Sequence, residues 1–340
     1  MPLPERKLIA RVRRTQPSGA TRTIVHGIGD DCAVLRPPPK DDLLVTTDFS
    51  LEGVHFRRDW HSAASVGHRC LTRGLSDIAA MGGVPLATFL SFALPHDLPQ
   101  KWVDEFQRGF LRLARRFGTR LAGGDTAQSP EGVMADIVVI GSVPRGKAVL
   151  RSGARAGDYI FVTGTLGSPA GVLRGLQRAG KSGAENGALP LPTKDARGSG
   201  ALSLVPARAR RKFLYPEPRL EVGKWLREGG LTSAMIDISD GLSTDLSHIC
   251  EESGVGAWLV DEEIPVASGA TLEDALNGGD EYELLFTVRE SKRKHIPSRI
   301  AGVPVHWIGT IVEDCGLWLY VTEEGVGFKF QPQGWEHFKK

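Results

Sequence analysis

Carboxylate side chains in glycine-rich turns and after apolar segments dominate the chemistry that this sequence could perform. Clustered carboxylates must share cations or lose their charge. Such oxygen ligands favour Mg²⁺ or Mn²⁺, and Mg²⁺ usually binds through a few carboxylates, waters and substrate phosphates. The pattern therefore predicts transfer of a phosphoryl group from a metal-bound phosphate compound. Eight aspartates in six short motifs make up the set: Asp30, Asp31, Asp48, Asp77, Asp125, Asp237, Asp240 and Asp280.

A structural role is the alternative for each single aspartate, since Asp is common in turns and at helix N-caps. Asp240, for example, could cap a helix that begins at Gly241. This explanation does not account for all six motifs together, because the aspartates follow apolar segments without compensating lysines nearby.

Two glycine motifs typical of nucleotide-binding loops do not have the context that their chemistry requires. Gly175–Ser182 matches the phosphate-binding pattern GxxxxGK[ST]. That loop must follow a strand and open a helix, whereas a helical pattern precedes this one. Gly27 and Gly29 open a dinucleotide-type GxGxxG, but Cys32 stands where the third glycine belongs. We expect neither a P-loop nor a Rossmann site.

Composition excludes several classes of partner. The 340 residues carry 42 basic and 40 acidic side chains, a formal net charge of +2, which argues against duplex DNA or an anionic membrane as a partner. No apolar run approaches the roughly 20 residues that cross a bilayer. The four cysteines lie far apart and form no CxxC pair. We therefore expect a soluble protein of the reducing cytoplasm, with no nucleic-acid or membrane partner.

Strand-like and helix-like patterns alternate along the chain, which indicates an α/β (α+β) protein. The length suggests two domains, and a basic segment around 144–158 places the boundary between residues 1–148 and 149–340. Residues 180–209 lack periodicity and are typical of a mobile insertion. A short strand is expected over Leu43–Thr47, ending at Asp48. Further strands are expected at 85–94, 135–143, 159–163, 234–238, 256–260, 283–288 and 317–321, and helices at 61–81, 100–117, 169–179, 219–228 and 241–253.

Several segments together resemble thiamine-monophosphate kinases, which share a superfamily with aminoimidazole ribonucleotide synthetase. They are GIGDDCAVL, TTDFSLEGVHF, RGLSDIAAMGG, AGGDT, VTGTLG, MIDISDGLSTDLSHI, GGDEYELLFTV and GWEHF, in order from about residue 5 to 338. The resemblance implies a two-domain fold whose N-terminal domain binds ATP and metal and forms a dimer barrel, followed by a C-terminal α/β domain. It also implies ATP-dependent phosphorylation of thiamine monophosphate to thiamine diphosphate by direct in-line transfer in a homodimer, the last step of thiamine diphosphate biosynthesis.

The same resemblance assigns roles to individual residues. Several Mg²⁺ ions would be held by Asp31, Thr46, Thr47, Asp48, Asp77, Asp125, Asp237 and Asp240. ATP would be contacted by Gly124, Asp125, Arg151 and Ser239, and thiamine monophosphate by His55, Asp280 and Trp335. Because a phosphate oxygen is already ionised near neutral pH, no protein general base is expected.

One departure concerns the substrate site. The family usually reads GGEDYEL, whereas this chain has GGDEYEL, so either Asp280 or Glu281 could face the cationic thiamine group. Other superfamily enzymes remain alternatives. A selenophosphate synthetase usually needs a reactive cysteine near its N-terminus, and a hydrogenase-maturation dehydratase needs a C-terminal cysteine, whereas this chain ends in HFKK. Two further alternatives are aminoimidazole ribonucleotide synthetase itself and a catalytically silent regulator that binds metal and nucleotide.

Overall fold

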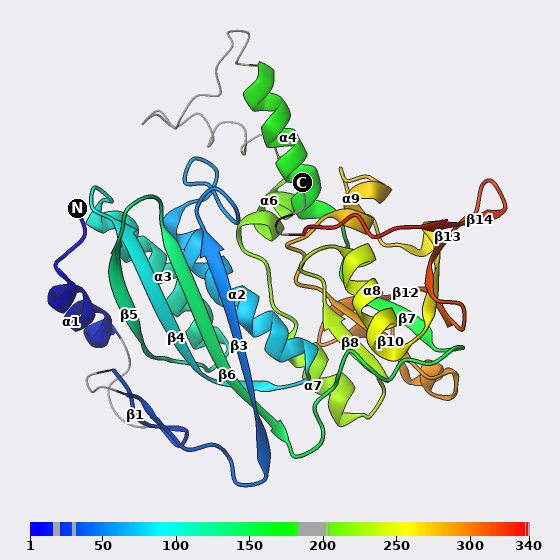
Figure 1. The fold of residues 1–340 in the computed structure, drawn as a ribbon, viewed down its shortest axis with the longest axis horizontal. Helices are drawn as coiled ribbons and strands as arrows, with labels where there is room; N and C mark the ends of the chain where they lie inside the picture. The colour runs from blue at the N-terminus through cyan, green and yellow to red at the C-terminus, as the bar shows by residue number, and fades with distance from the viewer. Residues whose placement is uncertain (16–20, 29–31, 183–201, 203–204, 337, 339–340) are drawn as a thin grey trace. The chain divides into compact units, whose positions relative to one another are not determined.

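The computed structural model describes residues 1–15, 21–28, 32–182, 202, 205–336 and 338. The chain divides into two compact units. The first comprises Met1–Ile78 and Gly83–Lys147, and the second Ala79–Gly82 and Ala148–Lys340. Both combine helices with a sheet, as the sequence predicts (Figure 1).

The first unit is built on a four-stranded sheet with helices against one face (Figure 1). Leu75 of α2 and Val139 of the sheet are fully buried, and Phe106 of α3 stacks on Phe92 of the sheet with ring centroids 4.4 Å apart. The elements in chain order are α1 (Glu5–Thr15), β1 (Ile24–His26), β2 (Val34–Leu35), β3 (Asp41–Leu51), α2 (Ala63–Ala80), β4 (Val84–Pro95), α3 (Gln100–Arg116), β5 (Leu121–Ser129) and β6 (Met134–Pro144).

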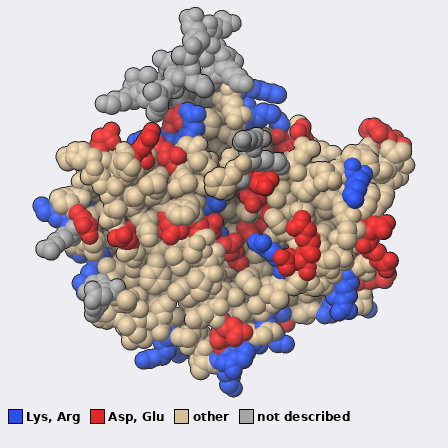
Figure 2. All heavy atoms as spheres, viewed as in Figure 1, with Lys and Arg blue, Asp and Glu red and all other residues tan. Residues whose placement is uncertain are grey.

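Strand order in this sheet is β3-β6-β4-β5, so β3 and β5 are its two edges. Only the β4–β5 pair is parallel. On the face away from the helices, β3 exposes Leu43, Val45 and Phe49, with 50%, 64% and 60% of their surface accessible. An apolar sheet face this exposed is typical of a surface that another protein covers. The surface over these strands is largely uncharged in Figure 2, with acidic side chains along one end.

The second unit has an eight-stranded sheet in the order β14-β13-β9-β12-β7-β10-β8, with β11 paired to β12. Its core joins inward strand residues such as Ile160 and Leu285 to buried residues of α8 such as Leu246. The elements are β7 (Tyr159–Thr163), α4 (Ser168–Ser182), α6 (Ala207–Leu214), α7 (Leu220–Glu228), β8 (Ala234–Asp237), α8 (Leu242–Ser253), β9 (Gly256–Val260), η1 (Asp261–Glu263), α9 (Leu272–Asn277), β10 (Leu284–Val288), η2 (Glu290–His295), β11 (Arg299–Ile300), β12 (Val303–Val312), β13 (Gly316–Val321) and β14 (Val326–Phe330).

Some predicted element boundaries are wrong. β3 continues three residues past Asp48 to Leu51, because residues 46–51 are paired with β6 although their sequence is polar. Gly123–Thr126, expected to be a turn, lies within β5, whose ladder to β4 compensates for the low strand propensity of glycine. The predicted insertion lies mostly outside the described residues, while Gly180–Ser182 completes α4. The P-loop pattern Gly175–Ser182 therefore lies within a helix, whereas a phosphate-binding loop must lie between a strand and a helix.

No helix among the described residues is long and apolar enough to cross a membrane.

Candidate active site

One strand and one helix of the first unit bring three predicted metal ligands together. Strand side chains alternate between two faces, and Thr46 and Asp48 of β3 lie on the face that meets α2. Thr46 Oγ1 donates a hydrogen bond to Asp77 Oδ2 on α2. Asp48 Oδ1 lies 3.6 Å from Arg73 Nη2, one helical turn before Asp77. Two carboxylates and a hydroxyl thus share one location.

The electrostatics of this location favour a cation. Burial, and then the neighbouring Asp77 carboxylate, raise the pKa of Asp48 to about 7, and Arg73 only partly opposes this shift. Ionising both carboxylates is therefore costly unless additional positive charge is supplied.

Thr47 and His55 lie near this cluster along the chain. The alternation of β3 places the Thr47 side chain on the opposite face from Thr46 and Asp48. Only its backbone could share a metal with them. His55 follows the end of β3, and its Nδ1 accepts a 3.0 Å hydrogen bond from the backbone N–H of Leu51. In the neutral ring the proton is therefore on Nε2, which suits His55 to donate to an anionic oxygen.

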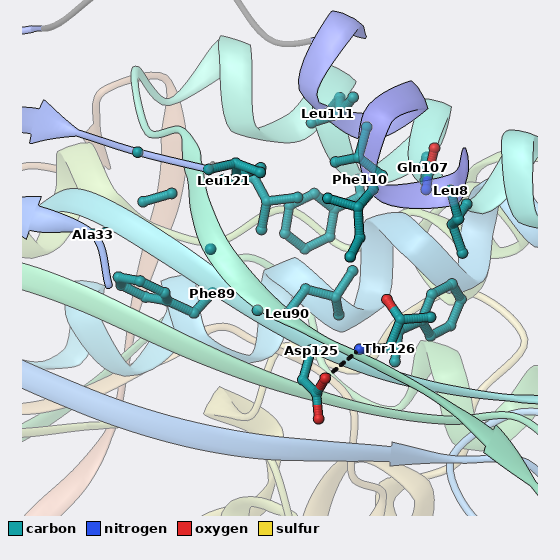
Figure 3. Close-up of a pocket in the computed structure, with 18 of the residues that line it drawn as sticks. Leu8, Ala33, Phe89, Leu90, Gln107, Phe110, Leu111, Leu121, Asp125 and Thr126 are labelled. Carbon is teal, nitrogen blue, oxygen red and sulfur yellow. Dashed lines mark hydrogen bonds between the residues drawn. The ribbon is translucent and has the colours of Figure 1, made fainter. Parts of the chain in front are cut away.

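Gly124 and Asp125 lie on β5, the edge of the sheet opposite β3. Asp125 is exposed, and its Oδ1 accepts a 2.8 Å hydrogen bond from the Thr126 backbone (Figure 3). Gly124 has a φ of 147°, and a Cβ there would lie 2.0 Å from the Leu90 carbonyl oxygen on β4. Glycine is therefore required for this part of β5 to approach β4.

A cavity of about 750 Å³ begins at Asp125 and Thr126 and extends beneath α1. Figure 3 shows that its walls are mainly apolar, with Gln107 contributing a carboxamide. Its size is in the range of about 300–1,000 Å³ that is usual for small-molecule sites. The walls include Leu8 of α1, Phe89 of β4, Phe110 and Leu111 of α3 and Leu121 of β5.

The second unit gathers a separate set of predicted residues around the start of α8. Asp237 ends β8 and is 3% exposed. Asp280 donates its backbone N–H to the Ser239 carbonyl at 2.8 Å, and Trp335 donates its own to the Asp240 carbonyl at 2.9 Å. The Trp335 side chain is 52% exposed. Metal, ATP and substrate residues predicted from distant motifs are thus neighbours here.

Asp245 holds the turn between β8 and α8. Its Oδ2 accepts backbone hydrogen bonds from Ser239, Asp240 and Gly241 at 3.0, 3.1 and 3.1 Å. Burial, and then the Asp240 carboxylate, raise the pKa of Asp245 to about 7. The helix has Gly241 at its N-cap and no side-chain cap there, so the capping role considered for Asp240 is absent.

Arg151 follows Leu150, whose carbonyl accepts a 3.0 Å hydrogen bond from the backbone N–H of Met235 on β8. The Arg151 carbonyl accepts a hydrogen bond from Ser253 at the last turn of α8, whereas Ser239 precedes the first turn. Twelve helical residues separate these ends by about 18 Å.

Comparison with known proteins identifies the family. The model for AIR synthase related protein, N-terminal domain, matches residues 29–143, and its C-terminal counterpart matches residues 155–322. Thiamine-monophosphate kinase of Salmonella typhimurium is 35% identical over 322 residues, covering 92% of this chain and 91% of the relative. That of Bacillus subtilis is 30% identical over 331 residues, covering 94% and 96%. The chain belongs to the thiamine-monophosphate kinase family.

Solved structures of thiamine-monophosphate kinases are also similar to this chain. Thiamine-monophosphate kinase from Stenotrophomonas maltophilia has 34% identity and a TM-score of 0.75, covering 94% of this chain and 96% of that one. A structure described as AaThiL complexed with AMPPCP and TMP has 28% identity and a TM-score of 0.72, covering 98% and 95%. The hydrogenase maturation protein HypE of E. coli, at 18% identity and a TM-score of 0.72, shares the fold.

Within the first unit of this thiamine-monophosphate kinase family member, the predicted metal ligands that meet are Thr46, Asp48 and Asp77. Among the described residues, no group of three or more His, Cys, Asp or Glu side chains is arranged to hold a metal. Asp31 lies outside the described residues. The donors that do meet, Thr46, Asp48 and Asp77, are all oxygen, and they fit Mg²⁺ if phosphates and waters complete its coordination.

Sequence reasoning about this family member missed two residues that shape the second-unit site. Asp245 was visible only as an acid in the first turn after the glycine at residue 241. Tyr282, whose hydroxyl donates to Asp280 Oδ1 at 2.6 Å, gave no signal beyond its place in the GGDEYEL motif.

Proposed function

We propose that this protein transfers the γ-phosphoryl group of ATP to thiamine monophosphate in the cytoplasm, giving thiamine diphosphate by direct in-line displacement with Mg²⁺. The observation that carries the proposal is the strand–helix cluster of Thr46, Asp48 and Asp77, in a chain whose curated relatives are thiamine-monophosphate kinases. A relative with the same fold has been solved with AMPPCP and TMP.

In the first unit the metal ligands would be the oxygen donors of Thr46, Asp48 and Asp77, and in the second unit they would be Asp237 and Asp240. Bound Mg²⁺ would neutralise phosphate oxygens of ATP and of the acceptor. The protein's own contribution is to hold the donors rigidly. The hydrogen bond from Thr46 fixes one Asp77 oxygen, and β3 and α2 set the spacing between Asp77 and Asp48.

The cavity beside Asp125 supports ATP binding in the first unit. Its apolar walls suit a nucleobase, and the Gln107 carboxamide supplies hydrogen bonds for the base edge. The phosphates would then extend past Gly124 and Asp125. Arg151 and Ser239 would contact other parts of the nucleotide, Arg151 through its bidentate guanidinium.

Substrate binding divides between anionic and cationic groups. His55 suits the phosphate of thiamine monophosphate, since Nε2 carries its proton. The Asp280 carboxylate suits the cationic thiamine moiety, and the exposed Trp335 ring suits stacking on its aromatic rings. The attacking phosphate oxygen is already ionised, so the reaction requires no general base from the protein.

A homodimer would complete the site. The apolar face of β3, β6 and β4 is exposed to solvent in a single chain, which favours burial against another protein surface. The two edge strands, β3 and β5, are long enough to pair with strands of another sheet. A second copy could close the two sheets into a barrel, with β3 of one chain beside β5 of the other. Metal ligands on β3 and β5 would then meet across the subunit boundary.

The experiment is a product assay. Purified protein is incubated with thiamine monophosphate, ATP and MgCl₂, and the products are identified by mass spectrometry. We expect thiamine diphosphate and ADP in equal amounts, with no product when EDTA replaces MgCl₂. Formation of AMP, or ATP hydrolysis without thiamine diphosphate, would overturn the proposal. Parallel incubations with selenide, and with the substrate of aminoimidazole ribonucleotide synthetase, test these other superfamily activities.

A further inference from the structure

The segment that carries Asp280 has an unusual backbone. Asp280 and Tyr282 both adopt positive φ, at 63° and 52°. For residues other than glycine this backbone conformation is strained, and it persists only where the surroundings impose it. Two backbone hydrogen bonds tie the segment to the end of β8, from Asp280 to Ser239 and from Tyr282 to Ile238, each 2.8 Å long.

A buried cluster of four charged side chains secures the same segment from the other side. Lys212 Nζ on α6 lies 2.6 Å from Glu281 Oε2 and 3.0 Å from Glu283 Oε1. Arg219 makes two hydrogen bonds of 2.7 Å to the two oxygens of Glu283. The Glu281 and Glu283 side chains are 0% and 1% exposed, so both carboxyl groups are held inside the protein by Lys212 and, for Glu283, by Arg219 as well.

This cluster determines which of the two adjacent acids, Asp280 or Glu281, can face a ligand. The Glu281 side chain is held in the protein interior, because its Oε1 also accepts a 2.5 Å hydrogen bond from the backbone N–H of Gly167. Asp280, by contrast, is only partly buried. Its Oδ1 accepts a 2.6 Å hydrogen bond from the hydroxyl of Tyr282, a residue that is itself 2% exposed. Tyr282 is therefore a fixed donor that sets the direction of the Asp280 carboxylate.

We infer that Tyr282 is a positioning residue for thiamine monophosphate: its hydroxyl orients the Asp280 carboxylate toward the cationic thiamine group, and the Lys212–Glu281–Glu283–Arg219 cluster holds its backbone in place. This inference rests on the proposed function, and it assigns the substrate contact to Asp280 rather than Glu281. The hydroxyl acts through Asp280 and takes no part in phosphoryl transfer.

The test is Tyr282→Phe, which removes one oxygen from a buried ring and leaves packing intact. A hydrogen bond to a charged group contributes about 1.5–3 kcal/mol, so we expect KM for thiamine monophosphate to rise at least about tenfold. The kcat and the KM for ATP should change less than about twofold, because neither depends on this carboxylate. Calorimetric Kd values for thiamine monophosphate should rise in parallel. Tyr320→Phe, a partly buried tyrosine on β13, is the matched control.

A double-mutant cycle with Asp280→Asn shows whether the hydroxyl acts through the carboxylate. Tyr282→Phe should add no further loss of affinity to Asp280→Asn. An unchanged KM in Tyr282→Phe, or equal losses on both backgrounds, would overturn the inference while leaving the kinase proposal intact. A parallel rise in the KM for ATP would also overturn it, since a general structural role predicts that result. Lack of thiamine diphosphate formation by the wild type would remove both proposals.

Discussion

Asp48 and Gly124 lie on the same rung of one sheet, at its two opposite edges. The ladder runs from Asp48 of β3 to Ile137 of β6, then to Leu90 of β4 and Gly124 of β5. Three strand spacings separate them by about 14 Å. Asp125, the next residue, is therefore too far from Asp48 to share a metal with it within one chain.

Subunit complementation tests whether the two edges meet between chains. Asp48→Asn and Asp125→Asn should each lose at least about 100-fold in kcat/KM, since each removes a metal ligand. When the two inactive variants are mixed and allowed to exchange subunits, activity should return to about one quarter of the wild-type value. Half of the dimers would be mixed, and each mixed dimer would keep one intact site. The measurement is thiamine diphosphate formation before and after exchange.

A mixture that stays inactive after exchange, shown by differently tagged subunits, would place Asp48 and Asp125 in the site of one chain. The control mixes Asp48→Asn with Asp48→Ala, which share the same defect and should not complement.

The two adjacent threonines of β3 should behave differently. Thr46→Val removes a hydroxyl that bonds Asp77, so the Mg²⁺ concentration for half-maximal activity should rise about tenfold, the equivalent of one hydrogen bond. Thr47→Val alters a side chain on the opposite face and should change that concentration less than about twofold. Magnesium titrations of activity distinguish the two. Equal effects would mean that the Thr47 hydroxyl also reaches the metal.

The apolar sheet face predicts the effect of a surface charge on assembly. Val45 is 64% exposed on this face, and Val45→Asp should produce monomers, because a carboxylate would be buried in the interface. Activity should fall with the dimer. The control is Val326→Asp on β14, where the side chain is 49% exposed. Sedimentation velocity measures both. A Val45→Asp dimer of normal activity would exclude this face as the interface.

Glu283 should contribute to stability in a pH-dependent way. Burial opposes its ionisation, but Lys212 and Arg219 outweigh burial and lower its pKa to about 2, from 4.5. The carboxylate therefore stabilises the fold fully above pH 4.5, and this contribution is lost as the pH falls toward 2. Urea unfolding of the wild type should show this loss, on the order of 3 kcal/mol by the usual conversion.

In Glu283→Gln that part of the pH dependence should be absent, and the variant should be less stable near neutral pH because Lys212 and Arg219 lose a partner. Exposed Glu324 provides the control, Glu324→Gln, which should follow the wild-type curve. Identical slopes for wild type and Glu283→Gln between pH 2 and 4.5 would contradict the prediction.

Periodicity predicted the fold class and most of the elements, because the helices and central strands bury one regular face. The expected strands Tyr159–Thr163 and Gly256–Val260 have the same bounds in the structure. Prediction failed where strand pairing outweighs local preference. The polar second half of β3 and the glycines of β5 are strands only because β6 and β4 supply ladder partners, and those partners are distant in sequence.

The site shows the same division. Conspicuous aspartates in motifs were visible, and Thr46, Asp48 and Asp77 do come together. The side chains that hold those motifs were not visible, since Lys212 and Arg219 resemble any other basic residues until α6 and the start of α7 are placed against Glu283. Which acid of the Asp280–Glu281 pair is buried also depends on this long-range packing.

The three backbone N–H groups gathered by Asp245 bear on how fast the site can be filled. A turn held by three hydrogen bonds has little conformational entropy left to lose when a nucleotide binds, so binding there should need no slow rearrangement of the turn. Encounter at this turn should therefore be limited by diffusion and by the charge of the incoming magnesium–nucleotide complex. Asp245 would in that case govern the speed of recognition without touching the molecule that is recognised.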